Sequence, residues 1–336
     1  MDLPTLTISA ANGWMNQEDR FSGNIAGKEQ KNYTLLHKGE LSYNHGNSKL
    51  AKYGTVFSLQ SYKEALVPRV YHSFKAEKGS PDFIEYYFAT KLPDRELGKL
   101  ISSGARMDGL LNIGYNEFMG IQMLFPSVEE QKQISNYFRS LEHLITLHQQ
   151  KITLLTKLKK AMLEKMFPKK GTVIPEFRFN GFANAWEQRK LGDEAEEILA
   201  GGDIDKEKAV DDGVYPIYAN ALTNDGIVGY YDDYYRVKAP AVTVTGRGEI
   251  GRARARMIDF TPVVRLLAVR SNHDCYFLEN AINNHKVVVE STGVPQLTVP
   301  QLSSYDICFP KDIVEEKKIG TYFNQLDHLI TLISVN

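Results

Sequence analysis

The chain has 336 residues, of which 43% are hydrophobic and 24% charged, and this length and balance suit two globular domains. The formal net charge of −1 argues against a uniformly basic nucleic-acid-binding protein, so a basic surface would have to be local. No run of 18 apolar residues is present, and the first residues lack the basic and apolar regions of a secretory signal. Two cysteines, Cys275 and Cys308, are far apart in the sequence, which fits a reducing cytoplasm and argues against a disulfide framework or a zinc site.

Residues 1–124 are predicted to form a first globular unit of mixed α and β structure. Alternating apolar and polar residues predict strands at 40–44, 54–59 and 68–74, and a short helix is expected at 81–92. The first turn of this unit carries three candidate DNA-binding residues, Asn44, Asn47 and Lys49. The same Asn-His-Gly-Asn stretch equally favours a plain hairpin turn with no binding role.

Residues 125–170 are predicted to be one long helix. Phe125-Pro126 fixes its start and Phe167-Pro168 its end. Apolar residues recur at alternating spacings of four and three, which is typical of a coiled-coil seam. The first members of this seam are Ile134, Phe138, Leu141 and Ile145. The alternative is a core helix that packs only on its own domain.

Residues 171–308 are predicted to form a second α+β unit, with strands at 241–245 and 263–269. Arg247 lies between two glycines in a turn after the first of these strands, and glycines allow a backbone to approach a groove closely. Arginines then alternate with small residues, which places their guanidinium groups on one face of a strand. Arginine reads guanine and asparagine reads adenine, and both also bind phosphate. The candidate DNA-binding residues here are Arg247, Arg252, Arg254, Tyr218 and Asn220. The alternative is a solvated arginine face that protects an edge strand from aggregation.

Residues 309–336 repeat the start of the long helix. Tyr-Phe, a leucine, an acidic residue and His-Leu-Ile-Thr-Leu follow in the same order from Tyr137 and from Tyr322. The second seam has the same phase, through Ile319, Phe323, Leu326 and Ile330. Since each stripe can bury its apolar face against the other, the repeat predicts an antiparallel pair of helices within one chain.

No catalytic or cofactor-binding motif stands out in the sequence. It lacks a GxxxxGK[ST] loop, a GxGxxG turn after a strand, an HExxH motif and a Cys/His cluster. No nucleophile, base and orienting group can be assembled from it either. The simplest interpretation is a chain that is not itself the catalyst.

The chain resembles the specificity (S) subunit of type I restriction-modification enzymes. The resemblance rests on FRFNGFANAWEQRKLGD (177–193), TVTGRGEIG, STGVPQLTVPQL, and the duplicated Phe-Pro helix. It implies two target-recognition domains joined by long helices in an antiparallel coiled coil with pseudo-two-fold symmetry. It also implies a non-catalytic, cytoplasmic subunit that reads two halves of a split site in double-stranded DNA. Its partners would be two methyltransferase (M) subunits, which bind S-adenosylmethionine and methylate adenine at N6, and motor-nuclease (R) subunits, which use ATP and Mg²⁺.

Two departures from the family pattern leave other interpretations open. The first unit lacks a counterpart of the Trp-Glu-Gln-Arg-Lys-Leu-Gly segment, and the second helix is shorter than the first. We therefore expect an unpaired apolar remainder at Ile152–Met166, which would require a partner. One alternative is a truncated or silent specificity subunit that folds without assembling, and another is a coiled-coil adaptor with no DNA role.

Overall fold

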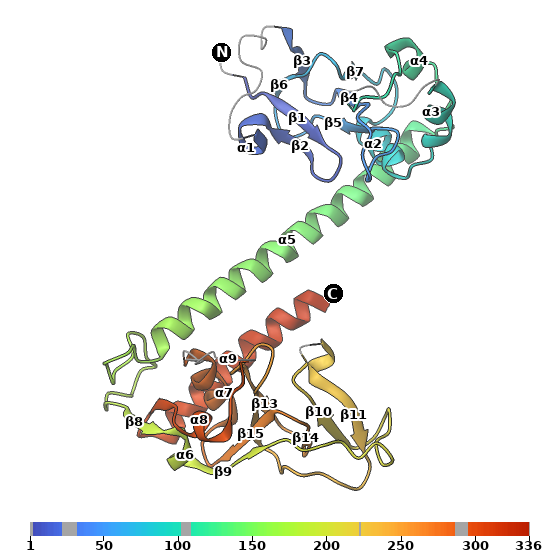
Figure 1. Cartoon of the computed structure of the whole chain (residues 1–336). Helices are drawn as coiled ribbons and strands as arrows, with labels where there is room; N and C mark the ends of the chain where they lie inside the picture. The colour runs from blue at the N-terminus through green and yellow to red at the C-terminus, as the bar shows by residue number, and fades with distance from the viewer. Residues whose placement is uncertain (1–2, 22–31, 102–108, 222, 286–294, 336) are drawn as a thin grey trace. The chain divides into compact units, whose positions relative to one another are not determined.

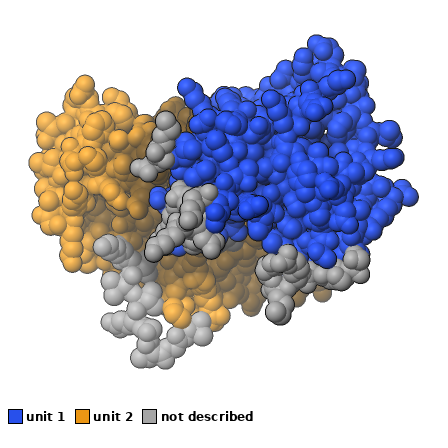
Figure 2. Space-filling model, turned by 90° about the horizontal axis from the view of Figure 1, so that it is seen from above, with its two compact units in different colours: residues 1–146 blue, residues 147–336 orange. Residues whose placement is uncertain are grey.

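The computed structural model describes residues 3–21, 32–101, 109–221, 223–285 and 295–335. The chain divides into two compact units, residues 1–146 and 147–336 (Figure 2). Each combines short strands with helices (Figure 1), so the α+β class predicted from the sequence is confirmed. Within the described residues, no helix is both long and apolar enough to cross a membrane.

The first unit contains three small antiparallel sheets, ordered β1-β2, β3-β6 and β5-β4-β7. Its strands are β1 Leu6–Ser9, β2 Gly13–Asn16, β3 Thr34–His37, β4 Leu41–Asn44, β5 Thr55–Ser58, β6 Glu64–Val67 and β7 His72–Phe74. Its helices are α1 Gln17–Phe21, α2 Pro81–Ala89, α3 Asp94–Leu100, α4 Tyr115–Met119 and the start of α5 Val128–Met166. The core forms where the apolar face of β4 meets α2 and α4. There Tyr43 stacks on Phe118 with ring centroids 4.2 Å apart.

The second unit is built around a four-stranded sheet ordered β13-β12-β15-β9, with smaller sheets β11-β10-β14 and β16-β8. Its strands are β8 Glu187–Lys190, β9 Ala195–Ala200, β10 Tyr215–Tyr218, β11 Ile227–Tyr231, β12 Ala241–Thr245, β13 Ala253–Arg256, β14 Thr261–Pro262, β15 Leu266–Ser271 and β16 Asp306–Phe309. Its helices are the end of α5, α6 Leu191–Glu194, η2 Thr223–Gly226, α7 Cys275–Asn284, α8 Val299–Ser303 and α9 Ile313–Val335.

The end of α5 and the helix α9 share the aromatic core of the second unit. Phe167 lies against Phe323 with ring centroids 6.1 Å apart, and Lys159 Nζ pairs with Asp327 at 2.6 Å. Earlier residues of α5 thus meet later residues of α9, so the two helices run antiparallel here. Trp186 and Phe277 complete this core.

The two units share a common frame that is more extensive than the repeated helix. In each, three adjacent strands share an apolar core with one helix: β5-β4-β7 with α2, and β13-β12-β15 with α7. Five residues after each helix N-cap, a glutamate accepts a hydrogen bond from an edge-strand amide. Ser58 N donates to Glu85 at 2.8 Å, and Ala255 N donates to Glu279 at 3.1 Å. Burial raises the pKa of both glutamates.

The attachment of this frame to the long helices is also duplicated. The amide of the N-cap residue Ser80 donates to Gln131 Oε1 of α5 at 3.2 Å. The amide of the N-cap residue Asp274 donates to Glu316 Oε2 of α9, also at 3.2 Å. Gln131 and Glu316 are 185 residues apart, as are Tyr137 and Tyr322. The sequence repeat of the two helices is therefore matched by a repeated hydrogen bond between each helix and the N-cap residue of its domain.

Candidate nucleic-acid interface

The turn after β12 presents Arg247 to solvent on a constrained backbone. A Cβ at Gly246 would lie 2.1 Å from the carbonyl oxygen of Arg265, so only glycine fits there. Gly248 has a φ of +73°, which also favours glycine. Arg247 itself is exposed, and its side chain forms no ion pair within the described residues. Its guanidinium is thus available to a base edge or a phosphate.

Asn220 supports this turn from within the protein. Its Oδ1 accepts hydrogen bonds from Gly246 N at 2.8 Å and from Arg247 N at 3.4 Å, while its Nδ2 donates to Val264 O at 3.1 Å. The sequence made Asn220 a candidate DNA contact, whereas the structure uses both ends of its amide inside the fold. Asn220 fastens the Arg247 turn to the neighbouring 263–265 turn.

Tyr218 is also placed behind the surface. The residue is buried, and the Arg256 guanidinium lies 3.7 Å from its ring centroid. Phe260 packs edge-on against the same ring at 5.4 Å. The sequence made Tyr218 a candidate DNA contact, but its ring is occupied by the core of its own unit. A cation–π contact of this kind instead stabilises the strand that carries the arginines.

The arginines of β13 differ in their surroundings. Arg254 and Arg256 both pair with Asp225, at 2.8 and 2.5 Å, and Arg256 is buried. Arg252 is exposed and pairs with Glu249 at 3.0 Å. Exposed pairs of this kind contribute only about 0–1 kcal/mol. A phosphate could therefore displace the acidic partners of Arg252 and Arg254, while Arg256 remains part of the core.

The first unit offers a corresponding turn after β4. Leu111 N donates to His45 O at 2.8 Å, just as Leu297 N donates to Gly246 O at 2.9 Å in the second unit. Asn47 lies two residues after its anchored carbonyl, and Arg247 lies one residue after its own. The two turns therefore occupy similar places on the shared frame and carry different side chains.

The candidate residues of this first turn fall into two groups. Asn44 folds the turn, since its Oδ1 accepts from Gly46 N at 3.0 Å and its Nδ2 donates to Ile8 O at 3.3 Å. Asn47 and Lys49 are exposed. The hairpin interpretation thus describes Asn44, whereas the side chains of Asn47 and Lys49 are free to meet a ligand.

The predicted helix seams are covered unequally. Three seam residues of α9 are buried, Ile319, Phe323 and Leu326, and Ile330 is half-buried. On α5, Ile134 is half-buried, while Phe138, Leu141 and Ile145 are 43%, 37% and 56% exposed. The seam on this part of α5 is therefore not covered in the way that coiled-coil packing would require.

The prediction of an unpaired remainder at Ile152–Met166 is wrong. Met166 is buried in the core of the second unit, and Leu155, Met162 and Leu163 pack against that core. The physical reason is the antiparallel direction, which brings the end of α5 beside the start of α9. Exposed apolar side chains lie earlier on α5 instead.

A partly buried charged cluster holds the domain of the second unit to α9. His273 Nδ1 lies 2.9 Å from Glu316 and its Nε2 lies 3.0 Å from Glu194. Burial alone would lower the pKa of His273, but the hydrogen bonds and charges of the two glutamates outweigh it and raise the pKa. Within the described residues, no group of three or more His, Cys, Asp or Glu side chains is placed to hold a metal ion.

Comparison with known proteins finds a family model that matches most of the second unit. A family model described as the type I restriction modification DNA specificity domain matches residues 184–335. Residues 184–335 are similar to this domain. The resemblance to specificity subunits that the sequence suggested is thereby confirmed.

One relative shows the same similarity. A Mycoplasma pneumoniae protein described as a type I specificity subunit is 28% identical over 220 residues, which are 62% of this chain. The chain spans 56% of that relative's length.

Solved structures show the same fold. The crystal structure of a type I S subunit from M. genitalium matches with a TM-score of 0.56 at 14% identity, covering 90% of this chain and 79% of that one. A structure from a study of complex assembly in the type I restriction-modification system matches with a TM-score of 0.50 at 14% identity, covering 89% of this chain and 77% of that one.

Proposed function

We propose that this chain is the DNA-recognition component of a type I restriction-modification system. It reads the two halves of a split site in double-stranded DNA, one with each unit, and carries no catalytic centre itself. Two methyltransferase subunits would supply S-adenosylmethionine-dependent methylation of adenine at N6. Restriction subunits would supply the ATP- and Mg²⁺-dependent motor and nuclease, and the assembly would act in the cytoplasm.

The observation that carries this proposal is a duplicated frame with two different exposed turns. The repeated anchors, from the N-cap amides to the carbonyls of His45 and Gly246, favour one binding geometry used twice. The side chains at the turns differ, with Asn47 in one unit and Arg247 in the other. Asparagine pairs bidentately with adenine and arginine with guanine. Two heads of one shape with unlike side chains suit an asymmetric site.

The test is co-expression of the chain with its cognate methyltransferase subunit, followed by mapping of N6-methyladenine on plasmid DNA. We expect a stable complex and methylation confined to one split motif with two specified blocks. Methylation of no motif, or of a motif with a single block, would refute split-site reading. A chain that stays free of the methyltransferase subunit would support the non-assembling alternative.

The adaptor alternative is separated by salt dependence. Release of counterions makes the logarithm of a DNA-binding constant fall linearly with the logarithm of salt concentration. We expect a steep slope for the complex on duplex DNA. A flat, weak response would favour a coiled-coil adaptor with no nucleic-acid role.

A further inference from the structure

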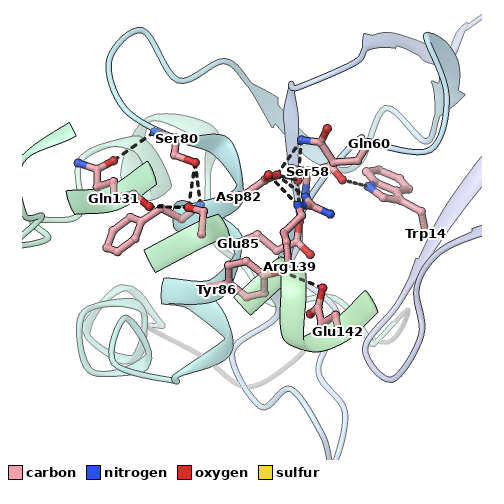
Figure 3. Close-up of polar contacts among 12 residues, drawn as sticks. Trp14, Ser58, Gln60, Ser80, Asp82, Glu85, Tyr86, Gln131, Arg139 and Glu142 are labelled. Carbon is pink, nitrogen blue, oxygen red and sulfur yellow. Dashed lines mark hydrogen bonds and ion pairs between the residues drawn. The ribbon is translucent and has the colours of Figure 1, made fainter. Parts of the chain in front are cut away.

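One polar face of α5 holds α2 over several helical turns (Figure 3). The residues on this face are Gln131, Ser135, Arg139 and Glu142. Because they are spaced by four, four and three positions, they lie on one side of the helix. Their partners follow in the same order: the Ser80 amide, the Ser80 hydroxyl at 3.0 Å, the Asp82 carboxylate, and the Tyr86 hydroxyl at 2.8 Å. The first unit is thus fastened along the helix rather than at one point.

The central contact of this row is a two-pronged ion pair. Arg139 Nε donates to Asp82 Oδ2 at 2.7 Å, and Arg139 Nη2 donates to the other carboxylate oxygen. Burial alone would raise the pKa of Asp82, but the hydrogen bond and charge of Arg139 outweigh it and lower the pKa. Two parallel hydrogen bonds between planar groups fix their mutual orientation as well as their distance. This pair therefore restrains the angle between α2 and α5.

The same carboxylate extends the restraint to the sheet. Asp82 Oδ1 accepts from Ser58 Oγ at 3.1 Å and from Gln60 Nε2 at 2.7 Å. Ser58 ends β5 and also accepts from Trp14 Nε1 through its carbonyl at 3.1 Å. Strand β5 follows directly from the turn that carries Asn47. A chain of short contacts thus connects the helix to the strand beside the exposed turn.

The second unit lacks this ion pair. The residue 185 positions after Arg139 is Asn324, which carries no charge. The residue equivalent to Glu142 is Asp327, and it pairs with Lys159 of α5 instead. The core of the second unit packs on both α5 and α9, whereas in the first unit the Asp82–Arg139 ion pair joins α2 to α5.

We infer that Asp82 and Arg139 are positioning residues that set the number of base pairs between the two half-sites. This inference rests on the proposed function. Neighbouring base pairs are about 3.4 Å apart along the duplex, so a change in the angle between α2 and α5 that displaced the exposed turn by this distance would change the gap by one base pair. Loss of the Asp82–Arg139 ion pair should therefore weaken the preference for one gap length, while the base specificity of each half-site stays the same.

The experiment compares methylation maps of the full chain and its variants in complex with the methyltransferase subunit. The variants are Arg139→Gln, Asp82→Asn and the charge-exchanged double variant Arg139→Asp/Asp82→Arg. Lys38→Ala is the control, since Lys38 is an exposed cation in the turn between β3 and β4 and is not part of the Asp82–Arg139 ion pair. For the two single variants, the preference for the wild-type gap over gaps one base pair longer or shorter should fall about 5- to 30-fold, as expected for loss of a half-buried charge-assisted pair.

The outcomes separate this inference from the proposed function. The inference is supported if the single variants keep the half-site bases but lose the preference for the wild-type gap, and if the charge-exchanged variant restores part of that preference. A wild-type split motif together with an unchanged gap in both single variants overturns it and leaves the proposed function standing. No split motif for the wild type overturns both. A loss of base identity at the half-site read by the first unit, with the gap preserved, also overturns the positioning role.

Discussion

Removal of one partner of the Arg178–Glu315 ion pair should destabilise the second unit strongly. Arg178 Nε and Nη2 contact the two Glu315 oxygens at 2.5 and 2.7 Å. The side chains are only 12% and 1% exposed. Arg178 lies in the segment between α5 and β8, and Glu315 lies in the first turn of α9, so the pair joins parts of the unit that are far apart in sequence.

The expected magnitude follows from this burial. Arg178→Met leaves the Glu315 carboxylate buried without a partner, which costs about 3–5 kcal/mol of unfolding free energy. Replacing both groups, as Arg178→Met/Glu315→Leu, removes the stranded charge as well. Replacement of a buried pair by apolar residues is often neutral, so the double variant should recover most of the loss.

Urea unfolding followed by tryptophan fluorescence gives the assay. The chain has two tryptophans, one in each unit, Trp14 and Trp186. In a Trp14→Phe background, the signal reports on Trp186, which is buried in the core of the second unit. A loss of less than about 1 kcal/mol for Arg178→Met, or a double variant no more stable than the single one, would contradict the assignment of a buried, charged pair.

Three further predictions concern the second unit. Because the pKa of His273 is raised above 6.5, the stabilisation that its charged form provides is complete below pH 6.5 and is lost as the pH rises through the folded-state pKa. The difference in urea midpoint between wild type and His273→Gln should therefore become smaller as the pH rises. A difference that stays constant with pH would exclude the charged form. Gly246→Ala should lower thermal stability, because its Cβ would lie 2.1 Å from Arg265 O; an unchanged melting temperature would contradict the close approach. Arg247→Ala should cost about 1–3 kcal/mol of binding free energy and relax the specificity at one base of one half-site, whereas Arg254→Ala should weaken binding to all sequences alike. Competition binding with single-base variants of the mapped site separates the two effects. A uniform loss of affinity for Arg247→Ala would refute base reading.

The long helices could be predicted from the sequence because their pattern is local. A heptad stripe bounded by Phe-Pro pairs predicts a long helix within residues 125–170, and α5 spans Val128–Met166. The direction of pairing was predicted as well, but the unpaired stretch was assigned to the wrong end of α5. Antiparallel packing reverses which residues meet, so a repeat read in chain order gives a misleading picture of what is left over.

The roles of the candidate site residues were harder to predict, since they depend on distant partners. Arg256 looked like Arg254 in the alternating stretch, but Tyr218 and Asp225, 38 and 31 residues earlier in the chain, draw it into the core. Asn220 looked like a reading group, but its partner Val264 lies 44 residues away. Among these candidates, only Arg247 had a local signal of exposure. The glycines on either side of it favour a tight turn through their own backbone conformation, without distant partners.

The duplicated N-cap contact has a consequence for how such a chain can change. At Ser80 and Asp274, the long helix binds a main-chain amide, a group that every residue except proline possesses. A different globular domain can therefore be grafted onto the same helix whatever its side chains, provided that it begins a helix at that point. The Asp82–Arg139 fork is different, because it demands a particular acid on the incoming domain. The helix α5 thus makes one contact that almost any domain can satisfy and one that requires an acidic residue at the position of Asp82. Exchange of domains would keep the first contact, and would keep the second only if the new domain supplied that acid.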